Sequence, residues 1–374
     1  MLALGLAACS NGDENPGGAP TTAADTSVPA ADTSAPAADT TAAPDTTAAA
    51  PAEWEAVTAP ADCMCSDGSG FEYYVKKADP AKVLLYFEGG GACFDRGTCG
   101  PESDSFSRVL GDPPSARGDG IFDDTDARNP FAGWSIVYVP YCTGDVHMGN
   151  TTTDYGDGVV IQHKGYVNAT TATKAAAAAF PDATQVAVVG ESAGGVAVPL
   201  YAGVIADLLP EASITAIADS SGAYPDIPGI NAVIGAQWGT MNAVPDWPEN
   251  EGMTVDRWSI PGLFVQAGRH APRIVFGRHD FATDRVQSFF SGLAGIPADD
   301  MVTLIDQNAR EIRDAGVPVA TYVAPGSDHT VFGRPGFYTE TVGGVLLVDW
   351  VTSLVTTGSA PDVHCDDAAG GCDA

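Results

Sequence analysis

Residues 190–194, Gly-Glu-Ser-Ala-Gly, have the types and the spacing expected around a nucleophilic serine. The preceding run, 185–189, is short, apolar and β-branched, which is typical of a buried strand. The following residues, 195–209, are small and apolar, which predicts a helix packed on a sheet. A G-x-S-x-G turn between a strand and a helix keeps side chains out of the turn and presents the serine hydroxyl at the sheet edge. The pattern therefore predicts that Ser192 is a nucleophile, which requires a base, an acid and an oxyanion hole from elsewhere in the chain.

One histidine has the chain position that a base partner of Ser192 needs. Residues 317–323 form an apolar run typical of a strand, and His329 lies in the loop that follows it. A serine hydroxyl is a poor nucleophile at neutral pH until a base accepts its proton, so we expect His329 to be that base. The acid has two candidates, Asp280 and Asp284, which both follow a predicted strand at 273–277. Asp280 lies at the shorter and more usual distance from the strand end.

Two segments are candidates for the oxyanion hole. One is the backbone N–H of Ala193, the residue after the nucleophile, and the other is the turn of Gly89, Gly90 and Gly91 after a predicted strand. A glycine-rich turn also suits phosphate, but no Lys-Ser/Thr pair follows this one and its flanks are acidic. We interpret Glu88 and Glu191, which flank the two segments, as structural braces.

The elements that position these residues alternate along the chain. Strands are predicted at 71–76, 82–87, 134–139 and 214–218, helices at 171–180, 301–315 and 337–355, surface loops at 95–128, and an irregular cap or pocket wall at 223–270. Alternating strands and helices predict an α/β fold with a mainly parallel sheet flanked by helices. With the serine turn, this predicts an α/β-hydrolase fold.

The charge of the chain restricts its partners. The 374 residues include 17 Lys and Arg against 48 Asp and Glu, for a formal net charge of −31. A protein this acidic is an unlikely partner for nucleic acid or for an anionic membrane surface, and it disfavours a polyanionic substrate.

The N-terminal part differs in composition from the rest. Residues 6–9, Leu-Ala-Ala-Cys, match a bacterial lipobox, which predicts a lipoprotein signal peptide at 1–9 with Cys9 as the lipidated residue. No Lys or Arg precedes Lys76, so either translation starts further upstream or the match is accidental. Residues 10–60 are rich in Ala, Thr, Pro and Asp, which predicts a disordered tether before a catalytic domain at 61–374.

Beyond Cys9 the chain has seven cysteines, which in an exported protein indicate disulfides. We expect local bonds between Cys93 and Cys99 and between Cys365 and Cys372. Cys65 is then expected to pair with Cys142, which leaves Cys63 without a partner.

At this point a family resemblance is visible in several spaced motifs. The segments that resemble the pectin acetylesterase family, which includes the Notum-type carboxylesterases, are Cys65 to Gly68, Phe87 to Cys93 with Cys99, Asn129-Pro130 through Trp134 to Asp145, and Gly190 to Gly195. The family's later Asp-x-x-Gln motif matches residues 284–287 and its histidine matches His329, so the resemblance spans roughly residues 65–338.

The resemblance implies an α/β-hydrolase that cleaves esters through a Ser–His–Asp triad without a metal or other cofactor. It implies oxyanion donors at Gly90, Gly91 and Ala193. It favours Asp284 over Asp280 as the acid, although Asp284 lies further from its predicted strand than expected.

We therefore expect a serine esterase outside the cytoplasm, lipid-anchored through Cys9 or secreted. By resemblance, its first expected substrate is an O-acetyl group on a polysaccharide, although the net charge disfavours a bare polygalacturonate chain. One alternative is a Notum-like carboxylesterase that takes longer acyl chains in an apolar pocket. Another is an inactive family member that acts as a surface-binding lipoprotein, against which the complete set of Ser192, His329 and an acid argues.

Overall fold

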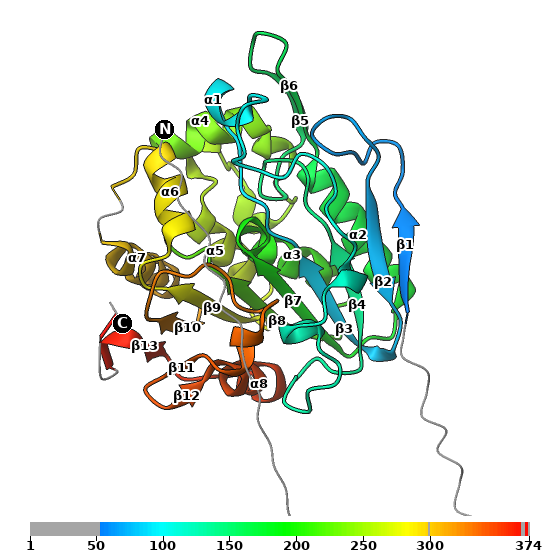
Figure 1. Ribbon diagram of the computed structural model, residues 1–374, viewed down its shortest axis with the longest axis vertical. Helices are drawn as coiled ribbons and strands as arrows, with labels where there is room; N and C mark the ends of the chain where they lie inside the picture. Colours follow the sequence, from blue (N-terminus) through cyan, green and yellow to red (C-terminus); the bar gives the residue numbers. More distant parts are fainter. Residues whose placement is uncertain (1–52, 298–299, 368–370, 373–374) are drawn as a thin grey trace, which may run out of the picture. The chain divides into compact units, whose positions relative to one another are not determined.

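The computed structural model describes residues 53–297, 300–367 and 371–372, and a nine-stranded sheet lies at its centre (Figure 1). The strands of this sheet are β1 (Trp54–Thr58), β2 (Glu72–Lys76), β3 (Asp79–Phe87), β4 (Trp134–Val139), β7 (Gln185–Glu191), β8 (Ser213–Asp219), β9 (Val275–Phe281), β10 (Val319–Ala324) and β13 (Val363–His364). Their order is β1-β2-β4-β3-β7-β8-β9-β10-β13. Strands from β4 to β13 pair in parallel, whereas β1 and β2 add an antiparallel edge. The sheet is mainly parallel, as predicted.

Helices cover both faces of the sheet (Figure 1). They are α1 (Arg96–Cys99), α2 (Gly165–Ala179), α3 (Ala193–Leu208), α4 (Pro228–Trp238), α5 (Ile260–His270), α6 (Arg285–Leu293), α7 (Met301–Asp314) and α8 (Leu347–Thr357). Side chains of α2, α3 and α5 pack with Val188 in one core, and those of α8, including Trp350, pack with Val189 in another. Because neighbouring residues of a strand point to opposite faces, two consecutive valines of β7 supply both cores. The fold is the predicted α/β-hydrolase architecture.

The folded domain begins before residue 61, which corrects the predicted boundary between tether and domain. Residues 54–58, placed in the tether from their composition, form β1, and Trp54 pairs with Lys76 of β2. The strand is at the sheet edge and largely exposed, so it lacks the apolar run that marks the other strands. The predicted signal peptide at 1–9, with Cys9, and tether residues 10–52 lie outside the described residues.

The predicted helix at 337–355 is shorter than expected. Residues 341–346 form a hairpin of β11 (Thr341–Val342) and β12 (Val345–Leu346), and α8 starts only at Leu347. Gly343 and Gly344 between the two strands have φ of 58° and 84°, a conformation that supports a tight turn and ends any helix.

The predicted strand at 273–277 is shifted toward the C-terminus, and this changes the position of both candidate acids. β9 continues to Phe281, so Asp280 lies inside the strand and Asp284 follows its end by three residues. The polar residues Arg278, His279 and Asp280 concealed the strand in the sequence. All three are buried: Arg278 pairs with Asp280, and Nδ1 of His279 lies 2.8 Å from the Asp219 carboxylate.

The segment at 223–270 is not irregular throughout, because it contains α4 and α5. Short 3-10 turns at Thr240–Asn242, Pro248–Asn250 and Val255–Arg257 lie between the two helices. A second small hairpin, β5 (Thr151–Asp154) with β6 (Val160–His163), lies outside the central sheet and was not predicted.

The three disulfides are those expected from the sequence. Cys65 bonds Cys142, Cys93 bonds Cys99 and Cys365 bonds Cys372. Cys63 is a buried free thiol. Within the described residues, no helix combines the length and the hydropathy needed to cross a membrane.

Candidate active site

Ser192 lies in the turn between β7 and α3, in a backbone conformation that serine rarely adopts. Its φ is 54° and its ψ is −120°, which costs free energy and persists only where the surroundings fix it. A Cβ on Gly194 would collide with the carbonyl oxygen of Phe87, and one on Gly190 would collide with the backbone of Gly194. The glycines of the motif are therefore required by close packing, as the sequence pattern predicted.

His329 and Asp284 are in direct contact. The Nδ1 of His329 lies 2.7 Å from Oδ2 of Asp284. Asp284 is fully buried, and its Oδ1 accepts hydrogen bonds from the N–H groups of Val286 and Gln287 at the start of α6. The His329 Nε2 is buried and has no hydrogen-bond partner among the described residues. The imidazole is thus held at one nitrogen, and its other nitrogen makes no hydrogen bond within the described part of the chain.

Asp280 has a different set of partners. Its Oδ1 accepts from the Gly222 N–H at 2.7 Å and from Nε2 of Gln287 at 3.1 Å, and its Oδ2 lies 3.3 Å from Arg278. Burial raises the pKa of this carboxyl above its ordinary value, and Arg278 opposes that rise. The two candidate acids are therefore separated by their contacts, because the hydrogen bond to His329 is made by Asp284.

Ser192 and His329 are brought to the same region without a direct bond. Among the described residues no hydrogen bond joins the Ser192 hydroxyl to His329. Both are tied to Asp219, whose backbone carbonyl accepts from the Ser192 N–H at 2.8 Å and whose carboxylate accepts from two N–H groups just after His329. Catalytic hydrogen bonds are often long before substrate binds, so this geometry is compatible with a serine–histidine pair.

The glycine turn after β3 lies against the serine turn. A Cβ on Gly89 would be 2.8 Å from the Glu191 carbonyl oxygen and 3.0 Å from the Ser192 Cβ. Gly90 and Gly91 have φ of 153° and 77°, which glycine tolerates best. No backbone hydrogen bond of the described residues uses the N–H of Gly90 or Gly91 as donor.

Glu88 and Glu191 share one arginine, in agreement with their interpretation as braces. Arg117 donates to Glu88 at 2.8 Å and to Glu191 at 3.2 Å. Glu88 also accepts from the Tyr141 N–H at 3.0 Å. Burial raises the pKa of Glu88, and its hydrogen bonds and the nearby arginine counter that effect. The guanidinium thus ties the residue before the glycine turn to the residue before Ser192.

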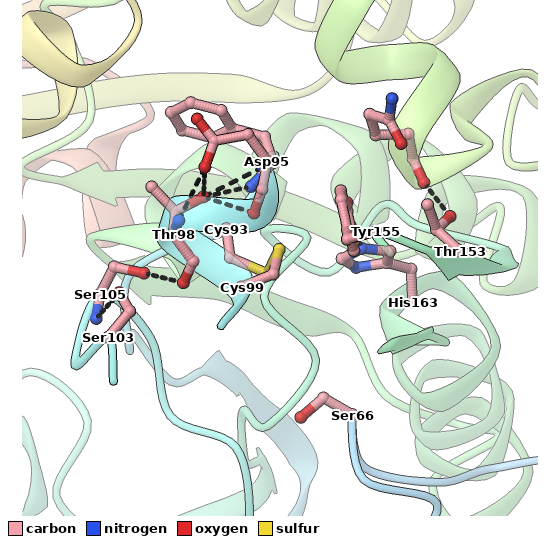
Figure 2. Close-up of a disulfide and its surroundings, with 12 residues drawn as sticks. Ser66, Cys93, Asp95, Thr98, Cys99, Ser103, Ser105, Thr153, Tyr155 and His163 are labelled. Atoms are coloured by element: carbon pink, nitrogen blue, oxygen red, sulfur yellow. Dashed lines mark hydrogen bonds between the residues drawn. A yellow bond between two sulfur atoms is a disulfide. The ribbon is translucent and has the colours of Figure 1, made fainter. Parts of the chain in front are cut away.

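A disulfide loop comes directly after the glycine turn, and Figure 2 shows this disulfide with its surroundings. Cys93 follows the turn and bonds Cys99, and Asp95 between them caps the short helix α1 through the Thr98 N–H. The indole N–H of Trp238 donates to the Cys93 carbonyl at 2.7 Å, which joins this loop to α4. The turn is therefore held from β3, from the disulfide loop and from the pocket wall.

An apolar pocket opens at Ser192. It has a volume of about 130 Å³ and is lined by Ser192 and Ala193 together with Gly91 of the glycine turn. The wall is formed by side chains of α3, α4, α5 and α6 and of neighbouring loops, including Phe94, Val146, Met148, Val196, Ile230, Ile234, Trp238, Trp258, Ile260, Leu263, Phe290 and Ile296. The segment at 223–270 thus forms a pocket wall, as expected.

A second groove adjoins the first at the glycine turn. It shares Gly91 and Phe290 with the apolar pocket and has a volume of about 440 Å³. Polar Asp104, Ser105 and Ser107 line it together with the aromatic rings of Phe106, Phe289 and Phe290. The glycine turn therefore separates an apolar pocket from a mixed polar and aromatic groove.

Two groups of side chains within the described residues have the spacing of metal ligands. One is His364, Cys365, Asp366 and Cys372, and the other is Cys93, Cys99 and His163. In both groups the cysteines form a disulfide, so they have no thiolate to offer a metal.

Sequence reasoning missed three residues that hold the site together. Asp219 and Arg117 have no local motif, because their partners are far away in the chain. Gln287 is part of the Asp-x-x-Gln motif, and its Nε2 lies 3.1 Å from both Asp280 and Asp284. The Asp-x-x-Gln motif was the one sequence feature that could have indicated the contact of Gln287 with the acid.

Comparison with known proteins agrees with this arrangement. A family model described as pectinacetylesterase matches residues 48–242, more than half of the chain. Palmitoleoyl-protein carboxylesterase notum2 of Xenopus laevis is 33% identical over 94 residues, which are 24% of this chain and 19% of that protein. Human palmitoleoyl-protein carboxylesterase NOTUM is 35% identical over 91 residues, 23% of this chain and 18% of that protein. The chain thus matches about a fifth of the length of these two relatives.

Two further proteins extend the comparison. The inactive palmitoleoyl-protein carboxylesterase notum1b of Danio rerio is 34% identical over 110 residues, 28% of this chain and 76% of that protein. The solved structure of the Wnt deacylase Notum from Drosophila superposes with a TM-score of 0.60, at 16% identity, over 84% of this chain and 96% of that one. At that identity the superposition supports the fold.

Proposed function

Because the chain belongs to the pectinacetylesterase family, we propose that it is a serine carboxylesterase with Ser192, His329 and Asp284 as its catalytic triad. The observation that carries the proposal is the serine in a constrained turn at the mouth of an apolar pocket, near a histidine held by a buried carboxylate. These are the parts that nucleophilic acyl transfer requires.

In the proposed mechanism, His329 accepts the Ser192 proton at Nε2 while the serine oxygen attacks the ester carbonyl carbon. Asp284 keeps the other proton of the ring on Nδ1 and stabilises the imidazolium that forms. The C–O bond to the alcohol then breaks, and His329 gives its proton to the leaving oxygen. Water, deprotonated by His329, attacks the acyl-enzyme and releases the acid with Ser192 regenerated.

The backbone N–H groups of Gly90, Gly91 and Ala193 are proposed to hold the oxyanion. Gly91 and Ala193 line the same pocket as Ser192. Gly91 belongs to the glycine turn and Ala193 to the serine turn, and the two turns are in contact. Donors fixed by the backbone need no reorganisation as negative charge develops on the carbonyl oxygen.

The acyl side of the substrate is proposed to be apolar and longer than acetyl. An acetyl group has a single methyl to bury, whereas the pocket at Ser192 is lined by aliphatic and aromatic side chains from four helices. Apolar area that the acyl chain removes from water contributes roughly 25 cal/mol per Å². This feature favours the longer-acyl alternative over the acetyl ester expected first from the sequence.

An O-acetyl group on a carbohydrate is the second candidate, and the groove beside Gly91 favours it. Aromatic rings next to hydroxyl and carboxylate groups suit a sugar, which offers an apolar face and several hydroxyls. In either case the alcohol part of the ester lies in this groove, on the far side of the glycine turn from the acyl pocket.

The test is hydrolysis of p-nitrophenyl acetate, butyrate and octanoate by the full chain, with Ser192→Ala and His329→Ala as variants. Each substitution is expected to lower kcat by about 10⁴-fold or more. The matched control is His270→Ala, which removes a histidine that contacts Asp207 and Glu249 instead. Absence of Ser192-dependent turnover would overturn the esterase proposal and support the inactive alternative, which the inactive Danio rerio relative illustrates. A kcat/KM that falls from acetate to octanoate would return the proposal to an acetylesterase.

We also propose that the protein works outside the cytoplasm, held to the membrane by a lipid on Cys9. The support is the lipobox and the three disulfides, which form in oxidising compartments. Palmitate labelling that is lost in Cys9→Ser, in cells that express the gene from an upstream start, is the expected result. Labelling that is unchanged by the substitution would refute the anchor.

A further inference from the structure

A fully buried carboxylate lies behind the proposed site and takes no part in the proposed chemistry. Asp219 ends β8 and has no exposed surface. Its Oδ1 accepts from Nδ1 of His279 at 2.8 Å and from the Ser220 hydroxyl at 3.2 Å. Its Oδ2 accepts from the N–H groups of Val331 at 2.7 Å and Phe332 at 3.0 Å. Burial works to raise the pKa of Asp219, but its hydrogen bonds, that from His279 foremost, lower the pKa below its ordinary value, so the group is ionised.

The same residue holds the serine turn through its backbone. The Asp219 carbonyl accepts from the Ser192 N–H at 2.8 Å. This bond continues the parallel pairing of β7 with β8, in which Glu191 lies opposite Asp219. The unusual backbone angles of Ser192 are thus stabilised by a strand end that is itself fixed by a buried ion.

The loop that carries His329 is tied to the same point. The N–H of Thr330 donates to the Ser220 hydroxyl at 3.0 Å, and the next two N–H groups donate to Asp219. Thr330 and Ser220 have φ of 48° and 57°. Both residues are strained in this left-handed region, and they are neighbours in space but not in sequence. The hydrogen bonds between their two segments stabilise these backbone conformations.

His279 completes the arrangement on the side away from the pocket. Its ring is fully buried and lies 4.9 Å from the ring of Phe281, 5.8 Å from Tyr322 and 6.0 Å from Phe332, measured between centroids. Its Nε2 has no hydrogen-bond partner among the described residues. The ring therefore acts as a fixed hydrogen-bond donor to Asp219.

We propose that Asp219 is a positioning residue that sets the distance between Ser192 and His329, with its carbonyl on the nucleophile and its carboxylate on the base loop. The proposal rests on the proposed esterase function. It makes Asp219–His279 a second Asp–His pair, which orients the backbone of the site, whereas Asp284 orients the catalytic imidazole. Asp219 does not touch the substrate.

The test compares Asp219→Asn with Asp145→Asn in the full chain. Asp145 is also fully buried, accepts from a threonine hydroxyl and from the Gly165 N–H, and does not contact the His329 loop. For Asp219→Asn we expect kcat to fall at least tenfold with KM within about twofold, and the rate of Ser192 labelling by a fluorophosphonate to fall in parallel. Asp145→Asn is expected to change Tm alone.

Ser220→Ala is the milder second variant, used also where Asp219→Asn does not fold. It removes the acceptor for Thr330 and leaves the carboxylate in place, and we expect a smaller loss of kcat with faster amide hydrogen exchange at residues 330–332. Wild-type kcat in both folded variants, or in Ser220→Ala where Asp219→Asn does not fold, would overturn the proposal. Hydrogen exchange separates the positioning role of Asp219 from the proposed esterase function. If the wild-type protein has no esterase activity, the esterase proposal fails, but faster exchange at residues 330–332 in the variants would still support the role of Asp219 in placing the His329 loop.

Discussion

Replacing Asp284 by asparagine is the sharpest test of the proposed triad, because the surroundings of this side chain fix how the amide must lie. The Oδ1 of Asp284 accepts from two backbone N–H groups, those of Val286 at 2.8 Å and Gln287 at 3.0 Å. In Asp284→Asn the amide oxygen keeps these two bonds, and the NH2 group takes the place of Oδ2, which gives up the single hydrogen bond that Oδ2 accepts from Nε2 of Gln287 at 3.1 Å. That group then faces Nδ1 of His329, where a proton acceptor lay 2.7 Å away.

The consequence is a histidine in the wrong tautomer. With a donor opposite Nδ1, the ring proton moves to Nε2, the atom that must accept the Ser192 proton. Loss of a hydrogen bond to a charged group costs about 1.5–3 kcal/mol, or about 10- to 150-fold in rate. The wrong tautomer adds to this, and the loss known for the equivalent change in a serine protease triad is about 10⁴-fold in kcat. We therefore expect a loss of about 10³- to 10⁴-fold.

The assay is kcat and KM for p-nitrophenyl butyrate, with Asp280→Asn as the matched control. Asp284 is fully buried and does not line the pocket, so KM is expected to stay within about twofold of wild type. Asp280 is equally buried and also contacts Gln287, but it does not touch His329. A larger loss for Asp280→Asn than for Asp284→Asn, or a kcat for Asp284→Asn above a tenth of wild type, would refute the assignment.

Three other outcomes follow from the structure. Gly194→Ala places a methyl against a backbone carbonyl at the end of β3, so we expect lost Ser192-dependent turnover with a lower Tm in thermal unfolding, and a wild-type Tm would contradict the packing. Ile234→Trp shortens the apolar pocket, so kcat/KM for octanoate is expected to fall at least tenfold while that for acetate stays near wild type; equal losses would argue against an acyl pocket. Burial lowers the pKa of His147 and His163 to about 4, so both rings stay neutral at pH 5.5 and the stability they contribute is lost as pH falls from about 6.5 to 4. Histidine NMR titration measures the two pKa values, and midpoints near 6.5 for both rings would refute the prediction. Burial raises the pKa of Asp145 to about 6, and protonation of this carboxyl in the folded protein opposes the loss of stability at low pH.

The strands of the central sheet were predictable where they are apolar, and less so where they carry polar side chains. Residues 134–139 were predicted as a strand and form β4 with the same ends, because all six are buried. β9 was misplaced since Arg278 and Asp280 interrupt its apolar run, and the partners that make their burial tolerable come from distant segments. Strand β1 was missed because its exposed edge position leaves no hydrophobic pattern.

The residues of the candidate site were predictable from local motifs, whereas their contacts were less so. The serine turn is set locally, since Gly190 and Gly194 meet the backbone of their own motif and of the end of β3. The glycine turn is less local, because Gly90 lies against Tyr141 and Gly91 against the Ser105 carbonyl. The choice between the two acids depends on where β9 ends, and the resemblance to a family motif favoured the residue that contacts His329. Asp219 left no signal, because its role consists of bonds to residues 112 and 113 positions away.

Asp284 and part of the apolar pocket wall belong to the same helix, α6, so the contact that orients His329 is linked to the pocket. Asp284 is the N-cap of α6, and a carboxylate at that position is stabilised by the helix N–H groups and the helix dipole. The next turns of the same helix carry Phe290 into the pocket. Gln287 lies between Asp284 and Phe290 in this helix. Its Nε2 donates to the carboxylates of Asp280 and Asp284, and its Oε1 accepts from the Ala223 N–H at 2.9 Å. We therefore expect a displacement of α6 by a bulky acyl chain to reach the carboxylate that holds His329, which would couple the fit of the proposed acyl group to the orientation of the proposed base.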